Sequence, residues 1–432
     1  MLVITAYRWY ARNPVVTVIE STQGAIWDVP FPAVTVCDIN VISKKAARSL
    51  SNNLTLPPHV TPDYVFKALK LIPLLFLGTI KEKDKEQLNI LQDIIDTNGI
   101  TLKTLFTTLS PTSSCDNLIQ RCMWKNIMYR CDQLFQQVTI KVGTCCSFNY
   151  FAIDDLDSHA SKLSTLPESR DASLIVSLPF HYRNLDLLQM STPRRVASCG
   201  YQTALTVLLK VDVDDYYSSG IASQGILVFI DNAYNIPDQD TPARMVSPST
   251  EVLIALAPER TYSTSGIKAF TPEQRQCYFH NEVTLANFKQ YSFHNCMVFQ
   301  RILTIQSECG CVPWFFPEQD GYRVCNFRDI DCIETLPERL SIKDLVNMPR
   351  SIRCLPECEH YDYPLEVAMG KLSSKVPLNG LPFFENVNIE NSSVLNIFFN
   401  DLVSTRYRRD VYLNWQNILG NVLTTKPRCK HI

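Results

Sequence analysis

Cysteines are the residues of this sequence whose number and spacing offer the most chemistry. The chain has 16 cysteines in 432 residues, and half of them lie within 275–363. An even number of cysteines in one segment is typical of a disulfide-stapled module, and this abundance indicates an oxidising compartment. The pair in Cys309-Gly310-Cys311 is separated by one residue, whereas structural zinc sites usually use Cys-x2–4-Cys units. We therefore expect disulfides there, with no metal and no cofactor.

No pattern in the sequence points to catalysis. The histidines form no HExxH motif, and the chain contains no Gly-x-Ser-x-Gly, phosphate-binding or dinucleotide-binding loop. His360 is expected at the surface, although its ordinary pKa of ~6.5 leaves a proton-sensing role open. The acidic run Asp212, Asp214 and Asp215 lacks the glycine and glutamate of a calcium loop, so we expect a solvated loop. A net charge of −2 does not indicate the basic surface that binds nucleic acid. The sequence thus predicts a protein that is not an enzyme.

Hydrophobic periodicity predicts the elements that must position the cysteines. Apolar residues recur at helical spacing over 282–305, with a break near 292–295, which predicts two helices. The stretch 81–96 predicts an amphipathic helix with a solvated face. Strand signals, which are β-branched and alternating runs, occur at 30–38, 138–149, 203–210, 225–231, 251–256 and 387–402. A mixed α+β fold follows from this combination.

A long ordered series of motifs lies within 275–363. The series is Arg275-x-Cys277, Tyr291-Ser292-x-x-Asn295-Cys296, Cys309-Gly310-Cys311-Val312-Pro313-Trp314-Phe315-Phe316-Pro317 and Cys354-Leu355-Pro356-x-Cys358. This series resembles the thumb region of degenerin/epithelial sodium channels, with the insect pickpocket branch the most similar. Two further segments, 31–38 (FPAVTVCD) and 143–149 (GTCCSFN), resemble the first extracellular strand and the Gly-x-Cys-Tyr-x-Phe-Asn segment of that family. In this setting Trp314-Phe315-Phe316 is expected to pack the base of the thumb.

The resemblance also implies a set of disulfides in the thumb. Carried over by position, the pairs are Cys277 with Cys358, Cys296 with Cys354, Cys309 with Cys332, and Cys311 with Cys325. The family has one further pair, and both of its positions are replaced here, by Gln300 and Ile352.

Seven cysteines before the thumb leave more than one pairing open. We prefer Cys122 with Cys131 and expect Cys37 to be a buried free thiol. Two bonds are possible within the set Cys115, Cys145, Cys146 and Cys199, without a fixed connectivity. Neighbouring cysteines such as Cys145 and Cys146 rarely bond to each other, because a disulfide needs β-carbons that face each other.

The fold implied by the resemblance is a disulfide-rich channel ectodomain with one antiparallel palm sheet, a β-ball, a helical finger and knuckle, and a helical thumb. By position the regions are the outer end of the first membrane helix (1–13), the first palm strand region (14–42), the finger (43–135), palm and β-ball strands with inserted loops (136–270), the disulfide-stapled thumb (271–360), the last palm strands and wrist (361–420), and a tail that does not match the second membrane helix (421–432).

The cysteines indicate a protein that is exported from the cytosol, but the sequence contains no clear export signal or complete membrane helix. Residues 1–11 do not resemble a signal peptide. The longest apolar run, 69–80, has about twelve residues and contains Pro73, against the ~20 of a membrane helix. No Gly-x-Ser selectivity filter follows Gly420. We therefore expect mainly the extracellular part of a subunit, with N-glycosylation sequons at Asn53 and Asn391.

Two functions are consistent with the resemblance. The first is a subunit of a trimeric, amiloride-sensitive sodium channel at the plasma membrane, with this chain extracellular and gating through the ectodomain. Its partners would be sodium ions, other subunits in a homo- or heterotrimer, and the membrane, reached through helices that are partial or missing here. The second is a truncated, non-conducting ectodomain that binds or regulates other proteins. An unrelated secreted cysteine-rich protein would have to match the motif series by coincidence.

Overall fold

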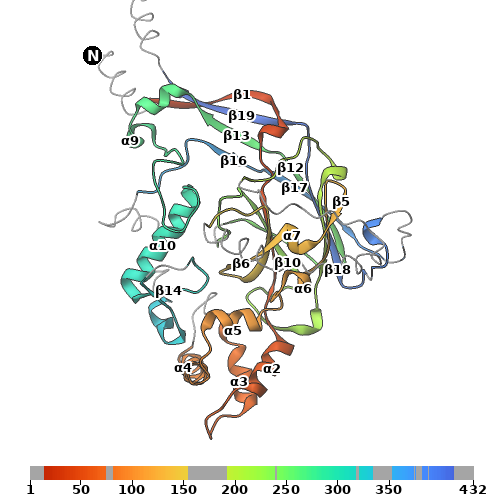
Figure 1. The fold of residues 1–432 in the computed structure, drawn as a ribbon, viewed down its shortest axis with the longest axis vertical. Coiled ribbons are helices and arrows are strands. Elements are labelled where there is room, and N and C mark those ends of the chain that lie inside the picture. Colours follow the sequence, from red (N-terminus) through yellow and green to blue (C-terminus); the bar gives the residue numbers. More distant parts are fainter. Residues whose placement is uncertain are drawn as a thin grey trace, which may run out of the picture.

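In the computed structural model the described residues are 14–73, 81–153, 192–238, 241–317, 321–333, 353–373, 375, 382–387 and 389–412. Three β-sheets make up the middle and one end of the molecule, a long helix lies along one side, and further helices lie at the opposite end (Figure 1). Within the described residues, no helix combines the length and apolar character needed to cross a membrane. The expectations for residues 1–13 and 413–432 lie outside the described part of the chain.

Two of the sheets pack against each other around the main core. The five-stranded sheet has the order β11 (Ala243–Val246), β10 (Ile226–Asp231), β2 (Ala33–Asp38), β7 (Gly143–Phe148) and β6 (Phe135–Ile140). The six-stranded sheet has the order β17 (Leu365–Lys371), β12 (Thr250–Leu256), β18 (Ser392–Phe399), β8 (Leu205–Lys210), β4 (Ile119–Trp124) and β5 (Ile127–Tyr129). The aromatic rings of Phe31, Trp124, Phe148 and Phe399 meet between them, with the Phe31 and Trp124 centroids 4.8 Å apart.

A third sheet, called here the terminal sheet, lies at the end of the molecule where the first and last described strands meet (Figure 1). Its order is β1 (Val15–Ala25), β19 (Val403–Val411), β13 (Glu259–Ser263) and β16 (His360–Asp362). β1 and β19 are antiparallel, so that Val15 lies opposite Val411. Two smaller sheets pair β3 (Asn40–Ser43) with β9 (Tyr216–Ser219), and β14 (Cys311–Val312) with β15 (Arg323–Val324).

The expectation of a single antiparallel sheet was wrong. The strands at 30–38, 138–149 and 225–231 share the five-stranded sheet, whereas those at 203–210, 251–256 and 387–402 belong to the six-stranded sheet. β12 also runs parallel to β18, and β13 runs parallel to β19. Parallel neighbouring strands need a long crossover between them. Here that crossover is the chain after β13 and before β18, which contains the eight cysteines within 275–363. Strand pairing of this kind depends on contacts between distant residues, which local periodicity does not contain.

Four helices form a separate unit at the opposite end from the terminal sheet (Figure 1). They are α2 (Lys44–Asn53), α3 (Pro62–Leu69), α4 (Glu82–Thr97) and α5 (Leu102–Leu109). The side chains of Ser43, Thr61 and Thr101 cap α2, α3 and α5 by accepting a backbone N–H in the first turn. The predicted amphipathic helix at 81–96 is α4, and its apolar residues pack within a single core of this unit.

The long helix α10 (Phe293–Cys309) covers the outer face of the five-stranded sheet. Its start confirms the second of the two helices predicted over 282–305, but the first was wrong. Leu285, Phe288 and Tyr291 are buried as expected, yet they lie in turns, because Asn287 has a positive φ of 67° and Phe288 bridges to Ile153. The helical spacing of these three residues therefore indicated that they are buried, but it did not indicate a helical backbone. The short helices are α6 (Cys115–Leu118), α7 (Cys131–Leu134) and α9 (Pro272–Arg275).

Candidate functional site: a disulfide-bonded helix joined to the terminal sheet

Helix α10 is fixed at both of its ends. The hydroxyl of Ser292 accepts the N–H of Asn295 at 3.0 Å and begins the helix. Cys296, Val298 and Ile302 are fully buried on the side that faces the five-stranded sheet. Gly310, with a φ of 63°, ends the helix in the left-handed conformation that favours glycine. The helix is thus held along one face as well as at its ends.

Four disulfides surround this helix. The bonded pairs are Cys277–Cys358, Cys296–Cys354, Cys309–Cys332 and Cys311–Cys325, the same pairs that the resemblance implies, and Cys122 is bonded to Cys131. The sulfurs of Cys311 and Cys325 lie close to the carboxylate of Asp329. Because both sulfurs are in a disulfide and Asp329 is paired with Arg323 at 2.6 Å, this group does not form a metal site.

The remaining cysteines correct two expectations. Cys37 is bonded to Cys145 rather than free, and Cys115 is bonded to Cys146, so the set of four contains one internal bond. Cys199 is free and half-buried. Successive residues of a strand point to opposite faces of a sheet, so Cys145 faces α10 whereas Cys146 faces the main core. This alternation in 143–148 was visible in the sequence, but the neighbour of Cys145 was not, because Cys37 lies 108 residues away.

The segment after Arg353 ties the start of α10 to the rest of the site. The hydroxyl of Tyr291, which is 1% exposed, donates a hydrogen bond to the carbonyl of Leu355 at 2.7 Å and accepts one from its N–H at 3.1 Å. Burial raises the pKa of Tyr291, so the hydroxyl stays protonated. Nearby, Cys358 donates its backbone N–H to Tyr278 at 2.8 Å. Hydrogen bonds and disulfides therefore join the segment 354–358 on one side to the start of α10 and on the other side to Cys277 and Tyr278.

The same segment is attached directly to the terminal sheet. Arg409 of β19 donates to the carbonyl of Glu357 at 2.8 Å, and the Ser263 hydroxyl of β13 donates to the carbonyl of Cys358 at 2.8 Å. The Cys277–Cys358 bond belongs to a small buried cluster against which Val15 and Val411 pack. The start of α10 is therefore connected to the outer ends of β1 and β19 through a few direct contacts.

The contacts of the Arg275 side chain show why an arginine precedes Cys277 in the Arg-x-Cys motif. Its side chain is 2% exposed and donates to the carbonyls of Cys277 at 3.0 Å and Phe270 at 2.7 Å. It is also paired with the carboxylate of Glu282, which in turn accepts the N–H of Phe279 at 2.9 Å. The planar guanidinium supplies several donors in fixed directions, so this arginine holds the turn that leads into the Cys277–Cys358 bond.

The His360 side chain is 26% exposed, so it lies partly at the surface, as expected, and is partly buried against the terminal sheet. Burial acts to lower the pKa of its imidazole, but the hydrogen bond to Asp362 at 3.1 Å and the carboxylates of Asp362 and Glu357 outweigh it, so the pKa is raised. Burial also raises the pKa of Glu357. These groups lie where β16 enters the terminal sheet.

Several other predicted residues lie elsewhere. The ring of Trp314 stacks on Phe106 of α5 with centroids 4.0 Å apart, so it packs on the helical unit rather than only on the base of α10. Asp215 is buried and accepts the Lys45 N–H at 2.8 Å at the start of α2, which corrects the expectation of a solvated loop. Asn53 and Asn391 are exposed, as a glycosylation acceptor must be.

Comparisons with known proteins agree with this architecture. The sequence model of the amiloride-sensitive sodium channel family matches residues 1–422. The sodium channel protein Nach of Drosophila melanogaster is 24% identical over 424 residues, covering 97% of this chain and 74% of that protein. Nach of Drosophila ananassae is also 24% identical over 424 residues, covering 97% and 73%. Pickpocket protein 28 of Drosophila melanogaster is 23% identical over 376 residues, covering 85% and 57%. The chain therefore belongs to the amiloride-sensitive sodium channel family, a family of ion channels and not of enzymes.

Proposed function

We propose that the chain is a subunit of a trimeric, amiloride-sensitive sodium channel at the plasma membrane, with the described residues on the extracellular side. Sodium ions and other subunits, the same or different, are its partners. N-glycans at Asn53 and Asn391 would suit that side. The regions assigned by resemblance place α10 and its disulfides in the thumb (271–360), the four-helix unit in the finger (43–135), and the terminal sheet in the palm and wrist.

The observation that carries this proposal is the connection from α10 to the terminal sheet. The strands β1 and β19 lie side by side and bring the first and last described residues together. Two segments that leave a domain side by side can respond together to one movement. In this scheme a stimulus displaces α10, the Cys277–Cys358 junction transfers the displacement to β19, and β1 moves with it through their shared ladder.

A sodium current tests the proposal. The chain is expressed in oocytes together with a Nach or pickpocket subunit, and its surface density is measured by labelling. We expect a current that depends on external sodium and is blocked by amiloride, from a surface complex that cross-links as a trimer. A chain that reaches the surface but gives no such current in any combination, or that cross-links only as a monomer, would contradict the proposal.

A further inference from the structure

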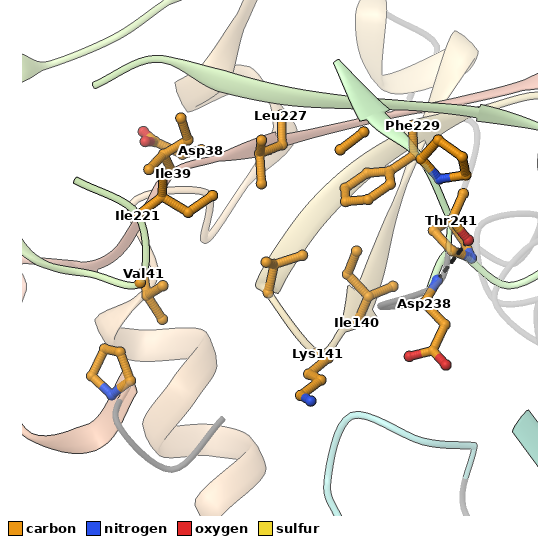
Figure 2. A pocket seen from close by; sticks show the side chains of 16 residues that line it. Asp38, Ile39, Val41, Ile140, Lys141, Ile221, Leu227, Phe229, Asp238 and Thr241 are labelled. Carbon is orange, nitrogen blue, oxygen red and sulfur yellow. Dashed lines mark hydrogen bonds between the residues drawn. The ribbon is translucent and has the colours of Figure 1, made fainter. Parts of the chain in front are cut away.

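A cavity of about 560 Å³ lies where the five-stranded sheet meets the helical unit (Figure 2). Its walls come from segments far apart in the sequence: the end of β2, the β6–β7 turn, β10, the loop before β10 and the loop before β11. Ile140, Ile221, Leu227 and Phe229 turn their side chains toward the open space in Figure 2. The volume lies within the range of ~300–1,000 Å³ that small-molecule sites occupy.

The two carboxylates in the wall are engaged away from this space, and in Figure 2 the Lys141 side chain points away from the apolar side chains that line it. The Asp238 carboxylate is paired with Arg301 of α10, and in Figure 2 it points away from the cavity. The Asp38 carboxylate also points away, and accepts hydrogen bonds from the Asn40 N–H at 2.8 Å and the Tyr216 hydroxyl at 3.2 Å. The interior therefore presents mainly hydrocarbon surface. Binding an apolar ligand there is favourable because it removes apolar surface from water. Binding a charged group without a partner is unfavourable because the charge loses its hydration.

We propose that this cavity is a binding site for an uncharged, apolar small molecule. Phe229, Leu227 and Ile140 form its floor, and Ile221, which is 37% exposed, lies at its mouth. Uncharged character follows from the orientation of the two carboxylates and of Lys141, and apolar character follows from the side chains that face inward. The proposal concerns binding alone and does not depend on whether the chain conducts sodium.

A regulatory consequence rests on the proposed channel function. The segment 234–238, which borders the cavity on one side, is bound to the start of α10 by several contacts. Asn295 accepts the Ile236 N–H at 3.1 Å and donates to the Tyr234 carbonyl at 2.7 Å, and a ring nitrogen of His294 lies 2.7 Å from the Ile236 carbonyl. A ligand that presses on this loop would act on the same helix that is joined to the terminal sheet.

The test uses the purified full chain and N-phenyl-1-naphthylamine, an uncharged probe whose fluorescence increases in apolar sites. We expect saturable binding by the unaltered chain. Ile221→Trp, which fills the mouth, and Ile221→Asp, which adds a charge there, should each lower the affinity about tenfold or more. Ile19→Trp is the matched control, because Ile19 is 62% exposed on β1 of the terminal sheet, and it should bind as the unaltered chain does.

Three results would overturn the proposal: no saturable binding by the unaltered chain, equal affinity in both Ile221 variants and the unaltered chain, or an equal loss in Ile19→Trp. Circular dichroism of each variant establishes that it is folded. Because the readout is fluorescence of a purified protein, failure here would leave the sodium current unaffected, and absence of a current would leave the binding result unaffected.

Discussion

Removing the Cys277–Cys358 disulfide by replacing both residues with serine is expected to lower the free energy of unfolding by about 2–5 kcal/mol. The two cysteines are 81 residues apart, so the bond restricts a long loop in the unfolded chain. Both are fully buried next to Val15 and Val411, so the variant should also loosen the outer ends of β1 and β19. The junction between α10 and the terminal sheet would then be held by the Cys296–Cys354 bond and by hydrogen bonds.

Two measurements check this expectation. Denaturant unfolding gives the loss of stability, and hydrogen exchange read by mass spectrometry should show faster exchange in β1 and β19. Cys199→Ala is the control, because Cys199 forms no disulfide, and it should change stability by much less. Exchange in the terminal sheet that stays at the unaltered rate after loss of the bond would show that the disulfide does not support this sheet.

Arg275→Ala is expected to lower the free energy of unfolding by about 3 kcal/mol, because it removes one partner of a buried ion pair. The variant leaves the carbonyls of Cys277 and Phe270 without their donor and leaves Glu282 without its cation. Arg275→Lys should recover only part of the stability, since an ammonium cannot reproduce the directions of a guanidinium.

The control for Arg275 is Arg130→Ala. Arg130 is 61% exposed and forms a surface pair with Asp132 at 2.5 Å, an interaction expected to contribute about 0–1 kcal/mol. Thermal unfolding of the three variants measures the difference. Equal losses for Arg275→Ala and Arg130→Ala would mean that the Arg275 contacts do not hold the turn into Cys277.

Much of the site could be predicted because its motifs are local and ordered along the chain. The series from Arg275 to Cys358 identified the family. Helix α4 was predictable from its own periodicity, since a helix shows a repeat of 3.6 residues within one segment. Glycine at position 310 likewise indicates where α10 ends.

Other features depend on contacts between residues far apart in the sequence. The division of the strands into separate sheets, the bond between Cys37 and Cys145, and the buried place of Asp215 at the start of α2 are of this kind. The turns at 282–291 show a second limit, because buried residues in irregular backbone can repeat with helical spacing. The cavity beside Leu227 escaped prediction for the same reason, since its walls come from several distant segments.

The central claim is that α10 acts on the terminal sheet through the segment that contains Leu355. The most direct test is the open probability of single channels containing Tyr291→Phe, a change that removes one oxygen and with it both hydrogen bonds to Leu355. Tyr201→Phe, at a residue that is 45% exposed, is the matched control. At equal surface density, the account predicts a lower open probability for Tyr291→Phe and an unchanged one for Tyr201→Phe. An open probability for Tyr291→Phe equal to that of the unaltered channel would contradict the claim.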